Sequence, residues 1–76
     1  MSCVYKIREG MANYTETEKK LADYILDNTR EVTLSSAKNL GERVGASAAA
    51  IIRFSQKLGY HGFTELKVDL ASDSSD

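Results

Sequence analysis

Two short helical patterns in this chain are joined by a turn of only a few residues. The first pattern covers residues 37–44, and the second extends from about residue 47 to residue 58. Gly45 stands where a left-handed residue commonly ends a helix, and Ser47 is a favoured N-cap for the next one. Helices joined by so short a turn cross at a steep angle, so this segment predicts a helix-turn-helix.

The apolar residues of these two segments are spaced to meet in the angle between the helices. Leu40 and Val44 are four residues apart in the first segment, and Ile51, Phe54 and Leu58 recur at intervals of three and four in the second. Such spacing places each set on one face of its helix. We therefore expect these side chains to be buried and the opposite face of the second helix to be exposed.

Helical spacing also recurs in the remainder of the chain, where the alternation typical of strands does not persist. Further helices are expected in the segments SCVYKIREG, YTETEKKLADYILDNT and GFTELKVDLA. Thr15 and Glu18 fit a capping box at the start of the second of these helices. Residues 28–30 are expected to end it.

The stretch between that helix and the helix-turn-helix is expected to be a connector. We expect Val32 and Leu34 to point inward from it, and Ser36 to be the N-cap of the helix over residues 37–44.

The length and these patterns predict one all-α domain. A chain of 76 residues is too short for two cores. We expect a compact bundle of about five short helices that contains a helix-turn-helix and covers residues 1–71. Residues 72–76 are polar and acidic, and are expected to form a disordered tail or the start of a linker.

The composition is that of a globular domain rather than a membrane or secreted protein. The chain is 42% hydrophobic and 28% charged. Its longest apolar run, residues 48–52, is too short to span a membrane, and the N-terminus has no secretory pattern. The lone Cys3 has no clustered partner for a disulfide or a metal. We expect a cytoplasmic protein with no cofactor, no metal and no membrane partner.

The charged residues are unevenly distributed along the chain. The net charge is −1, yet residues 36–67 contain five basic residues against two acidic ones, a net charge of +3. Lys and Arg gathered in this way favour binding to phosphates, because they displace counterions from nucleic acid. The helix-turn-helix lies within this basic segment.

The outer face of the second helix carries small and polar side chains. With only methyl groups at Ala48 and Ala49, the helix can approach base pairs closely and touch thymine methyl groups. Arg53 suits guanine or a phosphate, and Gln56 suits adenine. The candidate DNA-binding residues are Ser36, Lys38, Ser47, Ala48, Ala49, Ile52, Arg53, Gln56, Lys57 and His61.

Several of these residues also have a simpler interpretation. Arg53 could be a solvated surface residue, and Lys38 could pair with Glu42 one turn along the same helix. His61 could contact a phosphate or lie exposed in a loop, and it has no neighbours that would suit catalysis. Lys57 is expected to meet the DNA backbone.

Three stretches of the sequence resemble the N-terminal domain of the RpiR family of bacterial transcriptional regulators: SAAAIIRFSQKLGYHGFTELK, TETEKKLADYILDN and SSAKNLGERVGAS. In the first, a serine, a small residue, an RF pair, KLGY and GF-ELK follow one another as in the family. The similarity covers roughly residues 4–70. It implies a helical DNA-binding domain. We expect the protein to bind double-stranded DNA as a homodimer, at least in its full-length form, on two half-sites about one helical turn apart, because a monomer of this size would bind weakly.

The resemblance further implies that full-length members carry a larger sugar-isomerase-like domain after this one, and that the second domain senses a phosphosugar effector. We therefore favour a fragment without that C-terminal domain over a natural short protein, and expect it to come from a regulator of sugar or phosphosugar metabolism. Two positions depart from the expected pattern. Ala50 replaces a common threonine, which removes a hydroxyl that could bind phosphate. Gly41 stands where helix-turn-helix proteins usually have alanine, which is expected to cost about 1 kcal/mol of helix stability.

A second hypothesis is a helical protein–protein interaction module. In it, the small face formed by Ala48, Ala49 and Ile52 would pack against another helix, and the basic residues would be incidental. DNA binding should weaken steeply with salt, whereas apolar docking should hardly change. An enzyme has little support, because the sequence offers no paired acid and base and no activated nucleophile.

Overall fold

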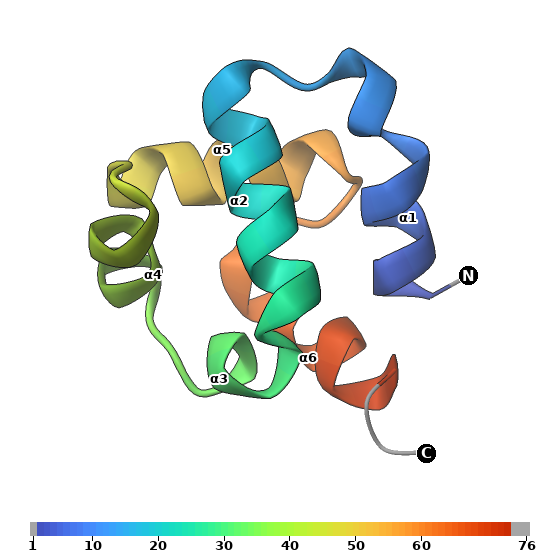
Figure 1. Cartoon of the computed structure of the whole chain (residues 1–76). Coiled ribbons are helices and arrows are strands. Elements are labelled where there is room, and N and C mark those ends of the chain that lie inside the picture. The colour runs from blue at the N-terminus through green and yellow to red at the C-terminus, as the bar shows by residue number, and fades with distance from the viewer. Residues whose placement is uncertain (1, 74–76) are drawn as a thin grey trace.

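The computed structural model describes residues 2–73, and every regular element in that range is helical. In chain order the elements are α1 (Cys3–Glu9), the 3₁₀ turn η1 (Met11–Asn13), α2 (Glu16–Asp27), α3 (Thr29–Thr33), α4 (Ala37–Val44), α5 (Ala48–Lys57) and α6 (Phe63–Asp73). The helices wrap around one another in a compact bundle with α2 crossing its centre (Figure 1). The all-α class expected from the sequence is confirmed.

One apolar core holds the helices together. Helix α6 packs against α1, α3 and α5, and α5 also packs against α4. The ring of Tyr14 meets Phe54 edge-on, with the ring centroids 5.2 Å apart and the planes at 60°. The large apolar side chains that are fully buried are Ile7, Leu21, Ile25, Val32, Leu40, Ile51, Phe54, Leu66 and Leu70.

Side-chain caps fix where α2 and α4 begin. Thr15 and Glu18 form the expected capping box: the Glu18 amide donates to Thr15 Oγ1 (3.2 Å) and the Thr15 amide donates to Glu18 Oε1 (2.8 Å). The Oγ of Ser36 accepts from the amide of Asn39, at 3.1 Å. All these caps were predicted, and the structure confirms them.

The segment after α2 differs from its prediction as a connector. It forms an additional short helix, α3, because the amide of Val32 donates to the Asn28 carbonyl (3.0 Å) and Thr29 Oγ1 donates to the Ile25 carbonyl (3.1 Å). This turn points Val32 into the core as expected. Leu34 ends the same turn on its outer side and is 82% exposed, so the prediction that it points inward is wrong.

The last helix extends beyond the boundary that was expected after residue 71. Ser72 and Asp73 are helical, so the prediction that these two residues belong to a disordered tail is wrong. The carboxylate of Asp73 accepts a hydrogen bond of 2.9 Å from the amide of Val4, which ties the end of α6 to the first turn of α1. Residues 74–76 of the expected tail lie outside the described residues.

Candidate nucleic-acid interface

The turn between α4 and α5 is tight because a single carbonyl closes it. Gly45 adopts the left-handed conformation with φ 75° and ψ 35°, and its amide donates to the carbonyl of Gly41. The amide of Ala46 donates to the same carbonyl, at 2.7 Å. The chain thereby reverses within two residues, as expected for Gly45. Helix α5 is held across the end of α4, as the left side of Figure 1 shows.

Gly41 has a role in this turn that the sequence did not reveal. It is buried in α4, and a Cβ atom built on it would lie 2.5 Å from the carbonyl oxygen of Ala46. Such a contact requires the backbone of the turn to move. The glycine therefore lets the two helices approach, in addition to its cost in helix propensity.

Helix α5 is divided into a buried and an exposed face. Ile51 and Phe54 are each only 1% exposed, as predicted. Ser55 is also fully buried, which was not predicted; its hydroxyl donates to the Ile51 carbonyl at 3.0 Å, so the polar group is satisfied within the helix. Val44 and Leu58, also expected in the core, are half-buried at its edge.

The exposed face of α5 is small and mostly apolar. Ala48, Ala49 and Arg53 are exposed, and Ile52 is 39% exposed. The first two turns of α5 therefore present methyl groups to solvent beside one long cation.

The first turn of α5 offers hydrogen-bond donors to a ligand. Ser47 caps the helix as predicted, and its Oγ accepts from the amide of Ala50 at 3.1 Å. By helix geometry the amides of Ala48 and Ala49 have no acceptor within the helix, and the helix dipole makes this end positive. This end of α5 is therefore suited to a phosphate oxygen.

Arg53 and Ser47 share a cleft of about 430 Å³ between the first turns of α2 and α5. Thr15, Thr17 and Glu18 line its other side. The sequence did not indicate this neighbourhood, because α2 and α5 are far apart in the chain and only the packing brings their first turns together. Thr17 is therefore a candidate ligand contact that the sequence analysis missed.

A second cleft, of about 640 Å³, lies on the other side of α5. It brings together Ser36, Ile52 and His61, three residues that the sequence analysis placed in the site. Lys67 also lines it, and its ammonium group donates to the Ser35 carbonyl at 3.0 Å. The sequence analysis counted Lys67 in the basic segment but did not place it in the site, because it lies on α6 beyond the helix-turn-helix. Lys38 is exposed on α4 and lines neither cleft.

Two of the candidate polar residues have partners on the protein surface. His61 has a 97% exposed side chain, and its Nδ1 lies 2.8 Å from Glu65 Oε2. This hydrogen bond raises the pKa of His61 above its usual value and so favours the cationic imidazolium. Gln56 donates from Nε2 to the His61 carbonyl at 3.3 Å, which holds its amide near the loop after α5.

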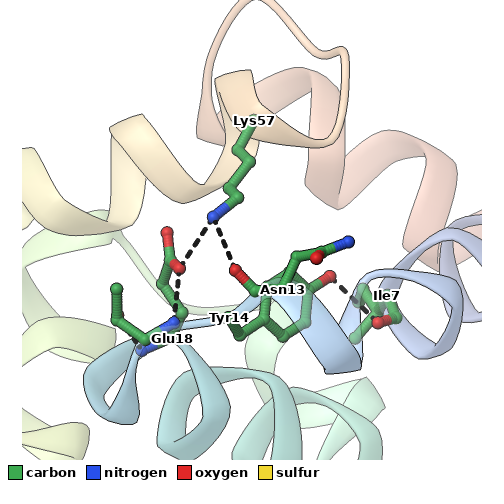
Figure 2. Close-up of polar contacts among 6 residues, drawn as sticks. Ile7, Asn13, Tyr14, Glu18 and Lys57 are labelled. Carbon is green, nitrogen blue, oxygen red and sulfur yellow. Dashed lines mark hydrogen bonds and ion pairs between the residues drawn. The ribbon is translucent and has the colours of Figure 1, made fainter.

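The side chain of Lys57 reaches from the end of α5 to the start of α2 and the end of η1 (Figure 2). Its ammonium group donates to Glu18 Oε1 at 2.9 Å and to the Asn13 carbonyl at 3.2 Å. A hydrogen bond from the Thr15 amide, and then the one from Lys57, lowers the pKa of Glu18 below its usual value, so the carboxylate is ionised. The lysine that was expected to meet the DNA backbone therefore already has protein partners.

Two further searches cover residues 2–73. No helix there is long and apolar enough to cross a membrane. No group of three or more His, Cys, Asp or Glu side chains in this range is arranged to hold a metal ion.

Helix α5 is thus held in place by its buried face and is exposed on its opposite face, and comparison with known proteins explains this arrangement. The family described as "Helix-turn-helix domain, rpiR family" matches residues 1–76. The chain belongs to the rpiR family. The resemblance seen in the sequence is confirmed. Helix-turn-helix domains of this family bind double-stranded DNA in transcriptional regulators and are not enzymes.

Two solved structures are similar to this rpiR-family domain. One is the N-terminal domain of ybbH, a protein assigned as a transcriptional regulator, from Bacillus subtilis; it is 31% identical, with a TM-score of 0.91 over 97% of this chain and 90% of that one. The other is the Vibrio vulnificus NanR protein complexed with ManNAc-6P, 27% identical with a TM-score of 0.92. The match covers 97% of the rpiR-family domain but only 28% of NanR.

Proposed function

We propose that this domain binds specific sequences of double-stranded DNA by inserting α5, with its cap at Ser47, into the major groove. The observation that carries the proposal is the face of α5 on which Ala48, Ala49 and Arg53 are exposed while Phe54, on the other side, is buried. The major groove is about 12 Å wide and admits a helix whose outer side chains are small. Helix-turn-helix proteins place the first turns of their second helix against base edges in this way.

Each exposed residue of α5 has a role that its chemistry suits. Ala48, Ala49 and Ile52 would contact thymine methyl groups, since they offer only aliphatic surface. Arg53 would donate to guanine or to a phosphate. Gln56 would break its hydrogen bond to the His61 carbonyl and contact the next base. These contacts give the sequence preference.

The residues beside α5 would fix its register on the duplex. Ser47, with the amides of the first turn, would bind one phosphate from the Arg53 cleft. On the other side, Ser36, Lys38 and His61 would meet the opposite backbone, and the raised pKa of His61 favours its protonated form, which can donate a hydrogen bond. Such contacts position the helix without reading sequence.

The regulator would act as a homodimer in the cytoplasm. The domain measures 30 × 26 × 23 Å, so two copies side by side fit two half-sites about 34 Å apart, one turn of the duplex. Two half-sites also supply the affinity that one small domain lacks.

We further propose that a sensing domain follows this one in the complete regulator. The support is that the domain spans 28% of NanR, which was solved with ManNAc-6P. A phosphosugar is therefore the class of effector to test, and sugar or phosphosugar metabolism the process to examine.

Selection of bound fragments from random duplex DNA, at low and at moderate salt, tests the proposed function. We expect one enriched sequence, with an affinity for the domain that falls steeply as the salt concentration rises. Recovery of no preferred sequence would contradict it. Binding to a protein helix with little salt dependence would favour an interaction module instead.

A further inference from the structure

The side chain of Lys57 joins the end of α5 to two preceding elements. Its ammonium group donates to Glu18 on α2 and to the carbonyl of Asn13 at the end of η1, and it lies 5.6 Å from the centroid of the Tyr14 ring. Figure 2 shows this side chain reaching down from α5 to Glu18 and Asn13. Two of its three donor hydrogens are thus used within the protein.

Each partner of Lys57 is itself held in place. Glu18 belongs to the capping box with Thr15, so its carboxylate is fixed at the first turn of α2. The hydroxyl of Tyr14 donates to the Ile7 carbonyl at 2.9 Å, and its ring packs against Phe54 in the core. Lys57 is therefore attached to a rigid part of the domain.

The location of Glu18 means that its ion pair with Lys57 affects the charge that the domain presents to DNA. Glu18 lines the same cleft as Arg53 and Ser47. An unpaired carboxylate there would repel the phosphates that the cleft is proposed to receive. Lys57 cancels this charge, and it follows Arg53 by four residues, one turn along the same helix. A Lys57 side chain that moved to a phosphate would expose the Glu18 charge to the duplex.

We infer that Lys57 is a positioning residue of the DNA interface. In the complex, as in the free domain, it stays bound to Glu18 and Asn13, sets the angle of α5 against α2, and contacts no phosphate. The inference rests on the proposed function, because it concerns how α5 is presented to DNA. It reverses the role that the sequence suggested for this lysine.

The experiment compares variants on the duplex obtained by selection, and measures affinity across a series of salt concentrations. The double substitution Glu18→Gln with Lys57→Met removes both charges, so the net charge of the domain is unchanged. We expect the slope of log affinity against log salt to equal that of the parent, and the affinity to fall about five- to twentyfold at every salt concentration. Lys57→Arg, which keeps a donor within reach of Glu18, should restore most of the affinity.

A second ion pair provides the matched control. Arg43 on α4 pairs with Glu31 on α3 and donates to the hydroxyl of Tyr24 on α2. Glu31→Gln with Arg43→Met removes an equivalent pair, and it should leave both the affinity and the slope unchanged. Both pairs are partly exposed and should contribute little to folding, so thermal unfolding should show that both double variants are folded.

Different results would overturn different claims. A slope smaller by about 0.9 in the Glu18→Gln, Lys57→Met variant would show that Lys57 contacts a phosphate. An unchanged affinity with a lower melting temperature would show that it only stabilises the fold. Either result would overturn the inference and leave the proposed function standing, whereas a parent domain that binds no duplex would overturn both.

Discussion

At the scale of single residues, α5 separates the side chains that stabilise the domain from those available to a ligand. Lys57 and Gln56 donate hydrogen bonds to other parts of the protein, whereas Arg53 lines a cleft between two helix N-termini. The residue with the most to offer a nucleic acid is therefore Arg53.

Replacing Arg53 by alanine should weaken binding to the selected duplex by about 1 to 3 kcal/mol, because a guanidinium contact to guanine or phosphate is lost. Alanine suits a helix, so the melting temperature should stay close to that of the parent. Arg30→Ala removes an exposed arginine of α3 and is the control, with affinity expected to remain within error. Equal affinities for parent and Arg53→Ala in a titration would remove Arg53 from the interface.

Gly41 provides a test of the turn. Gly41→Ala should raise helix propensity, yet we expect the free energy of unfolding to fall by about 1 to 3 kcal/mol, because the new methyl group meets the Ala46 carbonyl. A Cβ atom on Gly62 would have no atom within 4 Å, so Gly62→Ala should leave stability nearly unchanged. Denaturant unfolding of both variants measures the difference, and a stabilised Gly41→Ala domain would contradict the geometry described for the turn.

At the scale of elements, the presentation of α5 depends on what lies beneath it. Phe54 joins α5 to Tyr14 in the core, and the turn from Gly41 to Ala46 joins it to α4. These two attachments fix the helix near its start and near its end. The packing of α5 is thus a condition for any function of its outer face.

Phe54→Ala should lower the free energy of unfolding by about 3 to 5 kcal/mol, because it opens a cavity beside Tyr14. A domain of this size has little stability to spare, so we expect a large loss of the folded population in thermal unfolding monitored by circular dichroism. Ile52→Ala, on the exposed side of the same helix, should melt close to the parent. If Phe54→Ala also melted like the parent, the assignment of the core would be wrong.

The sequence predicted the elements whose limits are set locally. The capping box at Thr15, the caps at Ser36 and Ser47 and the left-handed Gly45 all depend on residues within one helical turn, and the structure confirms each of them. Helix α3 was missed because this segment could form either a short helix or an extended connector. Its hydrogen bonds to the end of α2 favour the helix, and the residue pattern alone does not reveal them.

What the sequence could not provide are the relations between distant segments. The partnership of Lys57 with Glu18, the cleft beneath Arg53 and the steric role of Gly41 all arise from how helices meet in space. Residue types at these positions were compatible with several roles, and only the packing distinguishes among them. The exposed face of α5 was predictable because helical period alone determines it.

At the scale of the whole molecule, the two ends of the described chain are joined. Asp73, near the end of α6, accepts from the Val4 amide in the first turn of α1, and α1 packs along α6. The negative charge of this carboxylate also interacts favourably with the positive end of the α1 dipole, at the N-terminus of α1. The bundle is thereby closed by a contact between its first and last helices.

Asp73→Ala should lower the free energy of unfolding by about 0.5 to 2 kcal/mol, as the loss of a helix-capping acceptor does. Asp23→Ala, which removes an exposed carboxylate from α2, is the control with little expected effect. Hydrogen exchange of the Val4 amide gives the direct measurement, since it should become faster in the Asp73 variant alone. An unchanged exchange rate would show that this contact does not hold α1.

The bare outer surface of α5 has a consequence for how such domains diversify. Ala48, Ala49 and Ile52 are exposed, whereas Gly41 and Phe54 are buried and leave little room for substitution. Substitutions at those three outer positions should alter which operator is bound at almost no cost to folding. A new target sequence is then reached by exchanging a few side chains on an unchanged frame, which makes these positions the place to randomise when engineering the domain toward a different promoter.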